Sequence, residues 1–252
     1  MIDLLPFLSE VQNWFGLTIA VLMESSRLKI KLKNGTILNL DNRKNNVFFK
    51  SFQTRLSLLR NILGIISFST SFSIKGKSTI EFSFDMKNFF IINLDDLKYE
   101  DYNLLELLFS GIRFGADFLT EKKGEFYDYR KKTLLILQMG KRKVVETYDG
   151  IKFYLDSINP GTFNETYVRD VHMINPDVDL NGKIVLDVGA ECGDTALYFA
   201  KMGATVLSFE PSPSSYQAML RNLELNPDIS KKINAINAGV GKDGLVTDRK
   251  SV

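Results

Sequence analysis

Residues 183–210 carry the strongest structural signal in the chain: Lys-Ile-Val-Leu-Asp-Val-Gly-Ala-Glu-Cys-Gly-Asp-Thr-Ala-Leu-Tyr-Phe-Ala-Lys-Met-Gly-Ala-Thr-Val-Leu-Ser-Phe-Glu. The pattern predicts a strand covered on both faces, a turn between Gly189 and Gly193, a helix, and a second buried strand that ends at Glu210. A strand, helix and strand of this length form a parallel crossover. Ligands of such sheets bind at the carboxyl ends of the strands, where Asp187, Gly189 and Glu210 fall.

The turn and the carboxylate after it are typical of a site for an adenosine-type cofactor. Gly189 leaves the backbone open to a ligand, Gly193 lets the helix start close to the strand, and the carboxylate of Glu210 can accept hydrogen bonds from both ribose hydroxyls. A dinucleotide motif, G-x-G-x-x-G, would need glycine where this chain has Glu191 and Asp194. Acidic side chains repel a diphosphate and suit a sulfonium and an ammonium, so the sequence favours S-adenosylmethionine over NAD.

Two motifs resemble a known family. Residues 187–199, Asp-Val-Gly-Ala-Glu-Cys-Gly-Asp-Thr-Ala-Leu-Tyr-Phe, and residues 209–213, Phe-Glu-Pro-Ser-Pro, resemble the FkbM-like family of class I S-adenosylmethionine-dependent methyltransferases. The resemblance extends from about Gly182 to the C-terminus. It implies a Rossmann-like α/β sheet and O-methylation of a hydroxyl on a sugar or small metabolite, with a small molecule or a glycan as the acceptor.

The resemblance also assigns cofactor-binding positions. Asp187 and Gly189 would contact the methionine end of S-adenosylmethionine, Glu210 would hold the ribose, and the end of a third strand would approach the adenine. Glu191 replaces an Asn that is usual in the family, and its carboxylate would either pair with the cofactor's ammonium or crowd it. The complete set of cofactor-binding candidates is Asp187, Gly189, Ala190, Glu191, Gly193, Glu210, Pro211, Asn237 and Ala238.

Catalytic residues are less well defined. A helix predicted over 163–173 carries Tyr167 and His172, and in methyltransferase folds the segment before the first strand often covers the site. His172 as a general base would help a hydroxyl attack the methyl group. The alternative interpretation, which we prefer, is that His172 has a structural role, in side-chain packing or in helix capping.

Composition excludes several classes of function. The chain has 252 residues, a formal net charge of +2, one Cys and one His. We therefore expect no nucleic-acid partner, no zinc site and no disulfide framework within one chain. Cys192 is predicted to be a small packing residue. The apolar segment 1–23 is predicted to be helical but has too short an apolar run to span a membrane, so we expect a cytoplasmic protein without a signal peptide or anchor.

Two domains are predicted: a β-rich α+β domain over 1–156 and a partial Rossmann-like methyltransferase domain over 157–252. In the first, Asn34-Gly35 predicts a type I′ hairpin turn between two strands, and Asp149-Gly150 is a second hairpin signal. Helices are predicted over 52–63 and 103–118, and a strand over 66–74.

The second domain is predicted to be incomplete. A class I methyltransferase sheet has the strand order 3-2-1-4-5-7-6, and the sequence supplies only strands 1 to 3. The first strand would then lack a neighbour on one side, which is an aggregation hazard. Three interpretations stay open: a truncated gene, a split enzyme completed by a second chain, or a non-catalytic nucleotide-binding or scaffold protein. A homo-oligomer or a completing chain is an expected partner.

Overall fold

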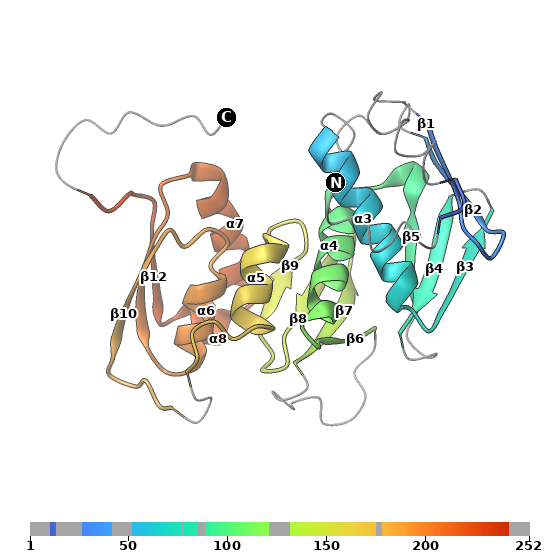
Figure 1. The fold of residues 1–252 in the computed structure, drawn as a ribbon. Helices are drawn as coiled ribbons and strands as arrows, with labels where there is room; N and C mark the ends of the chain where they lie inside the picture. The colour runs from blue at the N-terminus through green and yellow to red at the C-terminus, as the bar shows by residue number, and fades with distance from the viewer. Residues whose placement is uncertain are drawn as a thin grey trace. The chain divides into compact units, whose positions relative to one another are not determined.

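The structure is a computed structural model that describes residues 11–13, 27–41, 52–76, 78–84, 89–120, 132–174 and 178–241. The chain divides into two compact units, Met1–Met173 (unit 1) and Ile174–Val252 (unit 2), each with its own strands and helices (Figure 1). None of the helices in the described part of the chain has the length and apolar character that crossing a membrane requires.

Unit 1 combines helices with three small sheets, in agreement with the predicted mixture of α and β structure. A hairpin, a three-stranded antiparallel sheet and a mixed sheet follow one another, and among the described strands of unit 1 only the pair β6–β7 is parallel. The strands are β1 (Arg27–Lys31) and β2 (Ile37–Asp41); β3 (Ser71–Lys75), β4 (Thr79–Ser83) and β5 (Phe89–Asn93); and β6 (Asp117–Leu119), β7 (Thr133–Met139), β8 (Arg142–Glu146) and β9 (Lys152–Tyr154). The helices are α3 (Phe52–Phe68), η2 (Leu94–Asp96), α4 (Tyr99–Arg113) and α5 (Pro160–Tyr167).

The boundary between the units lies later than predicted. Helix α5 packs on α4, and the rings of Phe163 and Tyr167 on α5 lie 5.4 Å and 5.5 Å from the ring of Phe153 on β9. All three aromatic side chains are fully buried. The predicted boundary after residue 156 would cut through this cluster, so residues 157–173 belong to unit 1.

The first hairpin turn differs from the predicted type I′, and the second hairpin forms at Asp149-Gly150 as predicted. In the first, the Leu32 N–H donates to the Thr36 carbonyl at 2.8 Å and the Gly35 N–H donates to the Leu32 carbonyl at 3.0 Å, which encloses a three-residue loop. Gly35 has φ +86°, whereas Asn34 has no positive φ, and a type I′ turn needs positive φ at both central residues. The Asp149-Gly150 loop has the same hydrogen-bond pattern, with φ +85° at the glycine.

Other predicted elements shift at their ends. Helix α3 continues to Phe68, so the strand predicted over 66–74 begins only at Ser71. The helix predicted over 103–118 runs from Tyr99 to Arg113. The N-terminal helix is wrong at residues 11–13, because Val11 forms a β-bridge with Leu32; the remainder of the segment 1–23 lies outside the described residues.

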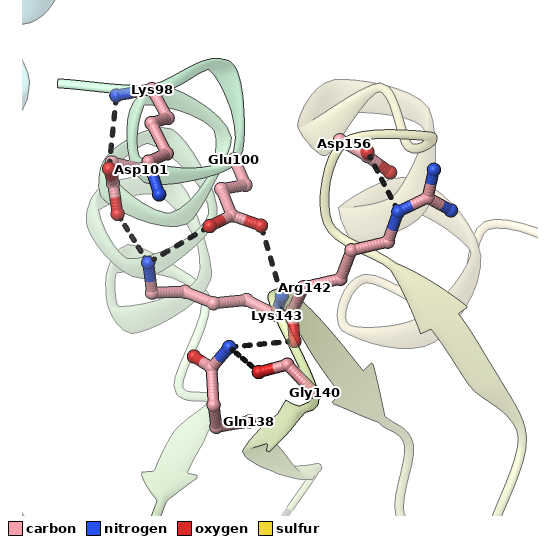
Figure 2. Close-up of polar contacts among 8 residues, drawn as sticks. All are labelled: Lys98, Glu100, Asp101, Gln138, Gly140, Arg142, Lys143 and Asp156. Atoms are coloured by element: carbon pink, nitrogen blue, oxygen red, sulfur yellow. Dashed lines mark hydrogen bonds and ion pairs between the residues drawn. The ribbon is translucent and has the colours of Figure 1, made fainter.

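A buried ion-pair cluster joins α4 to β8 (Figure 2). The Nζ atom of Lys143 lies 2.5 Å from an Asp101 carboxylate oxygen and 3.4 Å from a Glu100 carboxylate oxygen. The second Glu100 oxygen accepts the backbone N–H of Lys143 at 3.0 Å, and the second Asp101 oxygen accepts the backbone N–H of Lys98 at 3.0 Å. Both carboxylates are buried, so Lys143 is the cation that neutralises them.

Replacing Lys143 with Met is expected to lower the free energy of unfolding of unit 1 by about 2–4 kcal/mol, because two buried carboxylates lose their cation. Urea unfolding followed by circular dichroism measures the change. Lys75→Met is the matched control: its ammonium pairs with Glu81 but the side chain is 62% exposed, so about 1 kcal/mol or less is expected. Equal losses in the two variants would contradict a special role for the buried cluster.

Unit 2 contains a parallel sheet of three strands in the order β10-β11-β12. The strands are β10 (Ile184–Val188), β11 (Thr205–Phe209) and β12 (Ile233–Ile236), and the helices are α6 (Asp194–Lys201), α7 (Pro213–Glu224) and α8 (Pro227–Ser230). The predicted succession of strand, turn, helix and strand is confirmed. Small side chains let α6 pack closely on the sheet: Ala196, Ala200 and Ala204 form a buried cluster with Val206 of β11.

The helices that the structure describes in unit 2 lie on one face of this sheet (Figure 1). Val185 packs against the cluster beneath α6, whereas the alternate residues of β10 are open: Ile184 is 69% exposed, Leu186 64% and Val188 59%. Among the strands that the structure describes, β10 pairs only with β11. The prediction that β10 is covered on both faces is therefore wrong.

Candidate functional site

The turn between β10 and α6 is held against the end of β11. The N–H groups of Gly189 and Ala190 donate to the Phe209 carbonyl at 2.8 Å and 3.0 Å, and the Gly193 N–H donates to the Ala190 carbonyl at 2.7 Å. Gly189 has φ +86°, and a Cβ atom there would meet no atom within 4 Å. Backbone conformation, not crowding, requires this glycine, and the space beside it is open, as a ligand-binding turn needs.

The second glycine serves the packing of two helices. A Cβ atom on Gly193, which has φ +81°, would lie 2.8 Å from the Cγ atom of Met219 on α7. The sequence predicted close approach of the helix to the strand, and the structure shows that the close contact is with α7. The same helix fixes the turn through Asn222, whose side-chain amide donates to the Cys192 carbonyl at 3.0 Å. Cys192 is buried, as expected of a packing residue.

Glu210 connects the ends of β10 and β11. Its side chain is 7% exposed, one carboxylate oxygen accepts the Glu191 N–H at 2.8 Å, and the other accepts the Ser212 N–H at 2.8 Å. The bond to Glu191 supports a residue with φ +45°, which is costly for a side chain with a Cβ atom. Each carboxylate oxygen keeps acceptor capacity after these bonds, so the group can still receive two hydroxyls.

Two buried carboxyls lie at the same end of the sheet. Burial raises the pKa of Asp187 to about 6, partly opposed by a hydrogen bond from Ser208 at 3.5 Å and reinforced by the charge of Glu210. Burial also raises the pKa of Asp194 to about 6, and the charges of Glu191 and Asp187 add to the rise. Near neutral pH the site therefore concentrates negative charge, which favours a cationic ligand.

Asp194 is the residue that the sequence-based site omitted. The sequence indicates that its charge disfavours a diphosphate but does not place it among the predicted cofactor-binding residues. Its position as the first residue of α6 was the available signal, because that position points toward the carboxyl end of the preceding strand. The pKa coupling with Asp187 places the two carboxyls in one electrostatic group.

The end of β12 contributes to the same edge of the sheet. The side-chain amide of Asn237 donates to the Glu210 carbonyl at 2.8 Å and approaches the Pro211 carbonyl at 3.4 Å. The Ala238 N–H donates to the Ile236 carbonyl at 3.0 Å. Asn237, Ala238 and Pro211 are all exposed, so the structure brings the predicted residues together and leaves them accessible.

The catalytic candidates lie elsewhere in the chain. Tyr167 is 1% exposed and its ring lies 4.9 Å from the ring of Phe163, which explains it as a core residue of unit 1. His172 is half-buried and also belongs to unit 1; burial lowers its pKa, and the charge of Asp170 opposes this. Neither residue is part of the group that unit 2 assembles around Asp187 and Glu210.

Within the described ranges, no three His, Cys, Asp or Glu side chains are arranged to hold a metal ion. No protein-family model matches the chain, no curated protein matches it significantly, and neither does any solved structure. The geometry of unit 2 and the motif residues are therefore the basis for a functional proposal.

Proposed function

We propose that unit 2 binds S-adenosylmethionine and that the protein serves in the transfer of its methyl group to a hydroxyl oxygen of a sugar or small metabolite. The observation that carries this proposal is the position of Glu210, a buried carboxylate at the end of β11, hydrogen-bonded to the turn that ends β10. In parallel sheets this is where a ribose is held.

The residues present fit the chemistry of this cofactor. Glu210 would accept the two ribose hydroxyls, since each of its oxygens is used by only one backbone N–H in the described structure. Asp187, Asp194 and Glu191 would stabilise the ammonium and sulfonium charges, and the open space beside Gly189 would admit the methionine end. The exposed Asn237 would face the adenine.

The bound cofactor supplies a methyl group on a sulfonium, which a nucleophilic oxygen can attack in line. The contribution of this chain would be to orient the cofactor through Glu210 and the glycine turn, and to stabilise its positive charges through the buried carboxyls. Catalysis of this kind depends mainly on positioning. A non-catalytic nucleotide-binding or scaffold role is a second candidate, favoured by the open face of β10.

Calorimetric titration of the full chain with S-adenosylmethionine and, separately, with NAD tests the proposal. We expect micromolar binding of S-adenosylmethionine and no binding of NAD. The Asp228→Asn variant controls for a change of net charge in unit 2. Its carboxylate lies on α8 and is 92% exposed, so this variant should bind S-adenosylmethionine as the natural chain does. Binding of NAD alone, or of neither ligand, would contradict the proposal for this chain.

A further inference from the structure

Strand β10 presents an open edge as well as an open face. The residues that flank β10 show which way its backbone groups point. The Lys183 carbonyl accepts the Thr205 N–H at 2.9 Å, and the Gly189 N–H donates to the Phe209 carbonyl at 2.8 Å. The odd-numbered residues therefore direct their backbone N–H and C=O groups toward β11. Backbone direction alternates along a strand. The N–H and C=O groups of Ile184, Leu186 and Val188 therefore point away from β11, and the side chains of the same residues are the exposed ones.

This arrangement is self-complementary. If a second copy of β10 runs antiparallel about a two-fold axis at Leu186, then Leu186 lies opposite its own equivalent and Ile184 lies opposite Val188. All three residue pairs are of the hydrogen-bonded type, because each residue directs both backbone groups to the free edge. The six side chains then form one apolar row on the open face, and such cross-strand pairs stabilise a sheet.

Charge supports the antiparallel orientation. The carboxyl edge of the sheet carries Asp187, Glu191, Asp194 and Glu210, whereas the amino end of β10 carries Lys183. An antiparallel pair places each acidic edge beside the amino end of β10 in the other copy. In the register centred on Leu186, Lys183 lies opposite Gly189 of the second copy, next to its acidic turn.

We propose that two copies of this chain associate through β10, which pairs antiparallel with the β10 strand of the second copy about a two-fold axis at Leu186. The pairing joins the two sheets of unit 2 into one and satisfies the edge of β10 that its own chain leaves unpaired among the described strands. It also brings Lys183 of one copy to the candidate site of the other. The association does not depend on methyl transfer.

Disulfide crosslinking of full-length cysteine variants tests the register. Leu186→Cys places two thiols opposite each other with Cα atoms about 5.5 Å apart, which a disulfide can span. Ile184→Cys is the matched control: it lies on the same face and is similarly exposed, but its two copies would be about 14 Å apart, since four residues of about 3.4 Å separate them. The native Cys192 is buried.

We expect mild oxidation to give a covalent dimer of Leu186→Cys at least tenfold faster than of Ile184→Cys. Equal rates, or no dimer from either variant, would overturn the proposal.

In sedimentation velocity we expect a concentration-dependent dimer of the natural chain. Leu186→Lys should weaken it at least tenfold because two ammonium groups would face each other, whereas Val240→Lys, an exposed apolar control in unit 2, should not. A natural chain that stays monomeric at all concentrations would also overturn the proposal.

Discussion

Lowering the pH from about 7.5 to about 5 is expected to weaken binding of S-adenosylmethionine by about 10- to 100-fold and to stabilise unit 2 at the same time. Asp187 and Asp194 have pKa values of about 6, so both carboxyls become mainly neutral over this interval. At pH 5, each neutralised carboxyl that faces a cationic ligand lowers the affinity about tenfold, which corresponds to about 1.4 kcal/mol of binding free energy. Calorimetric titration across the interval measures the loss of affinity.

The effect of pH on stability has the opposite sign. Both carboxyls have pKa values near 6 in the folded protein and an ordinary value of 3.8, so the folded state binds more protons than the unfolded state between these two values. The penalty for burying the two charges is present in full above pH 6 and disappears as the pH falls toward 4. We expect the free energy of unfolding of unit 2 to rise by a few kcal/mol over this window, with at most about 3 kcal/mol from each carboxyl.

The Asp194→Asn variant tests whether the charge of Asp194 serves ligand binding or affects only the stability of the fold. The variant is expected to raise the free energy of unfolding of unit 2 by about 1–3 kcal/mol at neutral pH, because a buried charge is removed, and to flatten the rise below pH 6. It is expected to weaken S-adenosylmethionine binding at least tenfold. Asp228→Asn, at an exposed position, should change neither quantity. A destabilised Asp194→Asn variant with unchanged affinity would show that the charge serves the fold alone.

The local pattern around residues 183–210 is sufficient to predict the succession of strand, turn, helix and strand in unit 2. Ile184 to Leu186 and Val206 to Leu207 are short apolar runs, and Gly189 and Gly193 both adopt the positive φ that a glycine turn provides. Elements that a local sequence pattern defines, such as these two strands and helix α6, agree with the prediction. The parallel pairing followed from the length of the crossover.

A local sequence pattern cannot predict features that depend on contacts between residues far apart in the chain. The apolar character of Leu186 predicted burial, but burial requires a covering element, and composition does not reveal one. The hydroxyl of Tyr167 makes it a catalytic candidate in the sequence, whereas in the structure it packs against the rings of Phe153 on β9 and Phe163 on α5. The hydrogen bond between Glu210 and the Glu191 N–H joins residues that are 19 positions apart, and no local pattern encodes it.

Replacing Glu210 with Ala is expected to affect unit 2 in two ways. The Glu191 and Ser212 N–H groups lose a charged acceptor, and each such bond contributes about 1.5–3 kcal/mol, so the free energy of unfolding should fall by about 3–6 kcal/mol. Binding of S-adenosylmethionine should fall at least about 100-fold, because two hydroxyls lose the same acceptor. Chemical unfolding and calorimetry measure the two effects.

A 2′-deoxy analogue of S-adenosylmethionine distinguishes ribose recognition from loss of structure. If Glu210 accepts the ribose hydroxyls, the natural chain should lose about tenfold in affinity when the 2′-hydroxyl is absent, whereas Glu210→Ala should bind both ligands equally, because the interaction is already lost. Glu224→Ala, an exposed carboxylate at the end of α7, is the control and should discriminate as the natural chain does. A Glu210→Ala variant that still discriminates between the ligands would assign the ribose to another residue and leave Glu210 as a support for the turn.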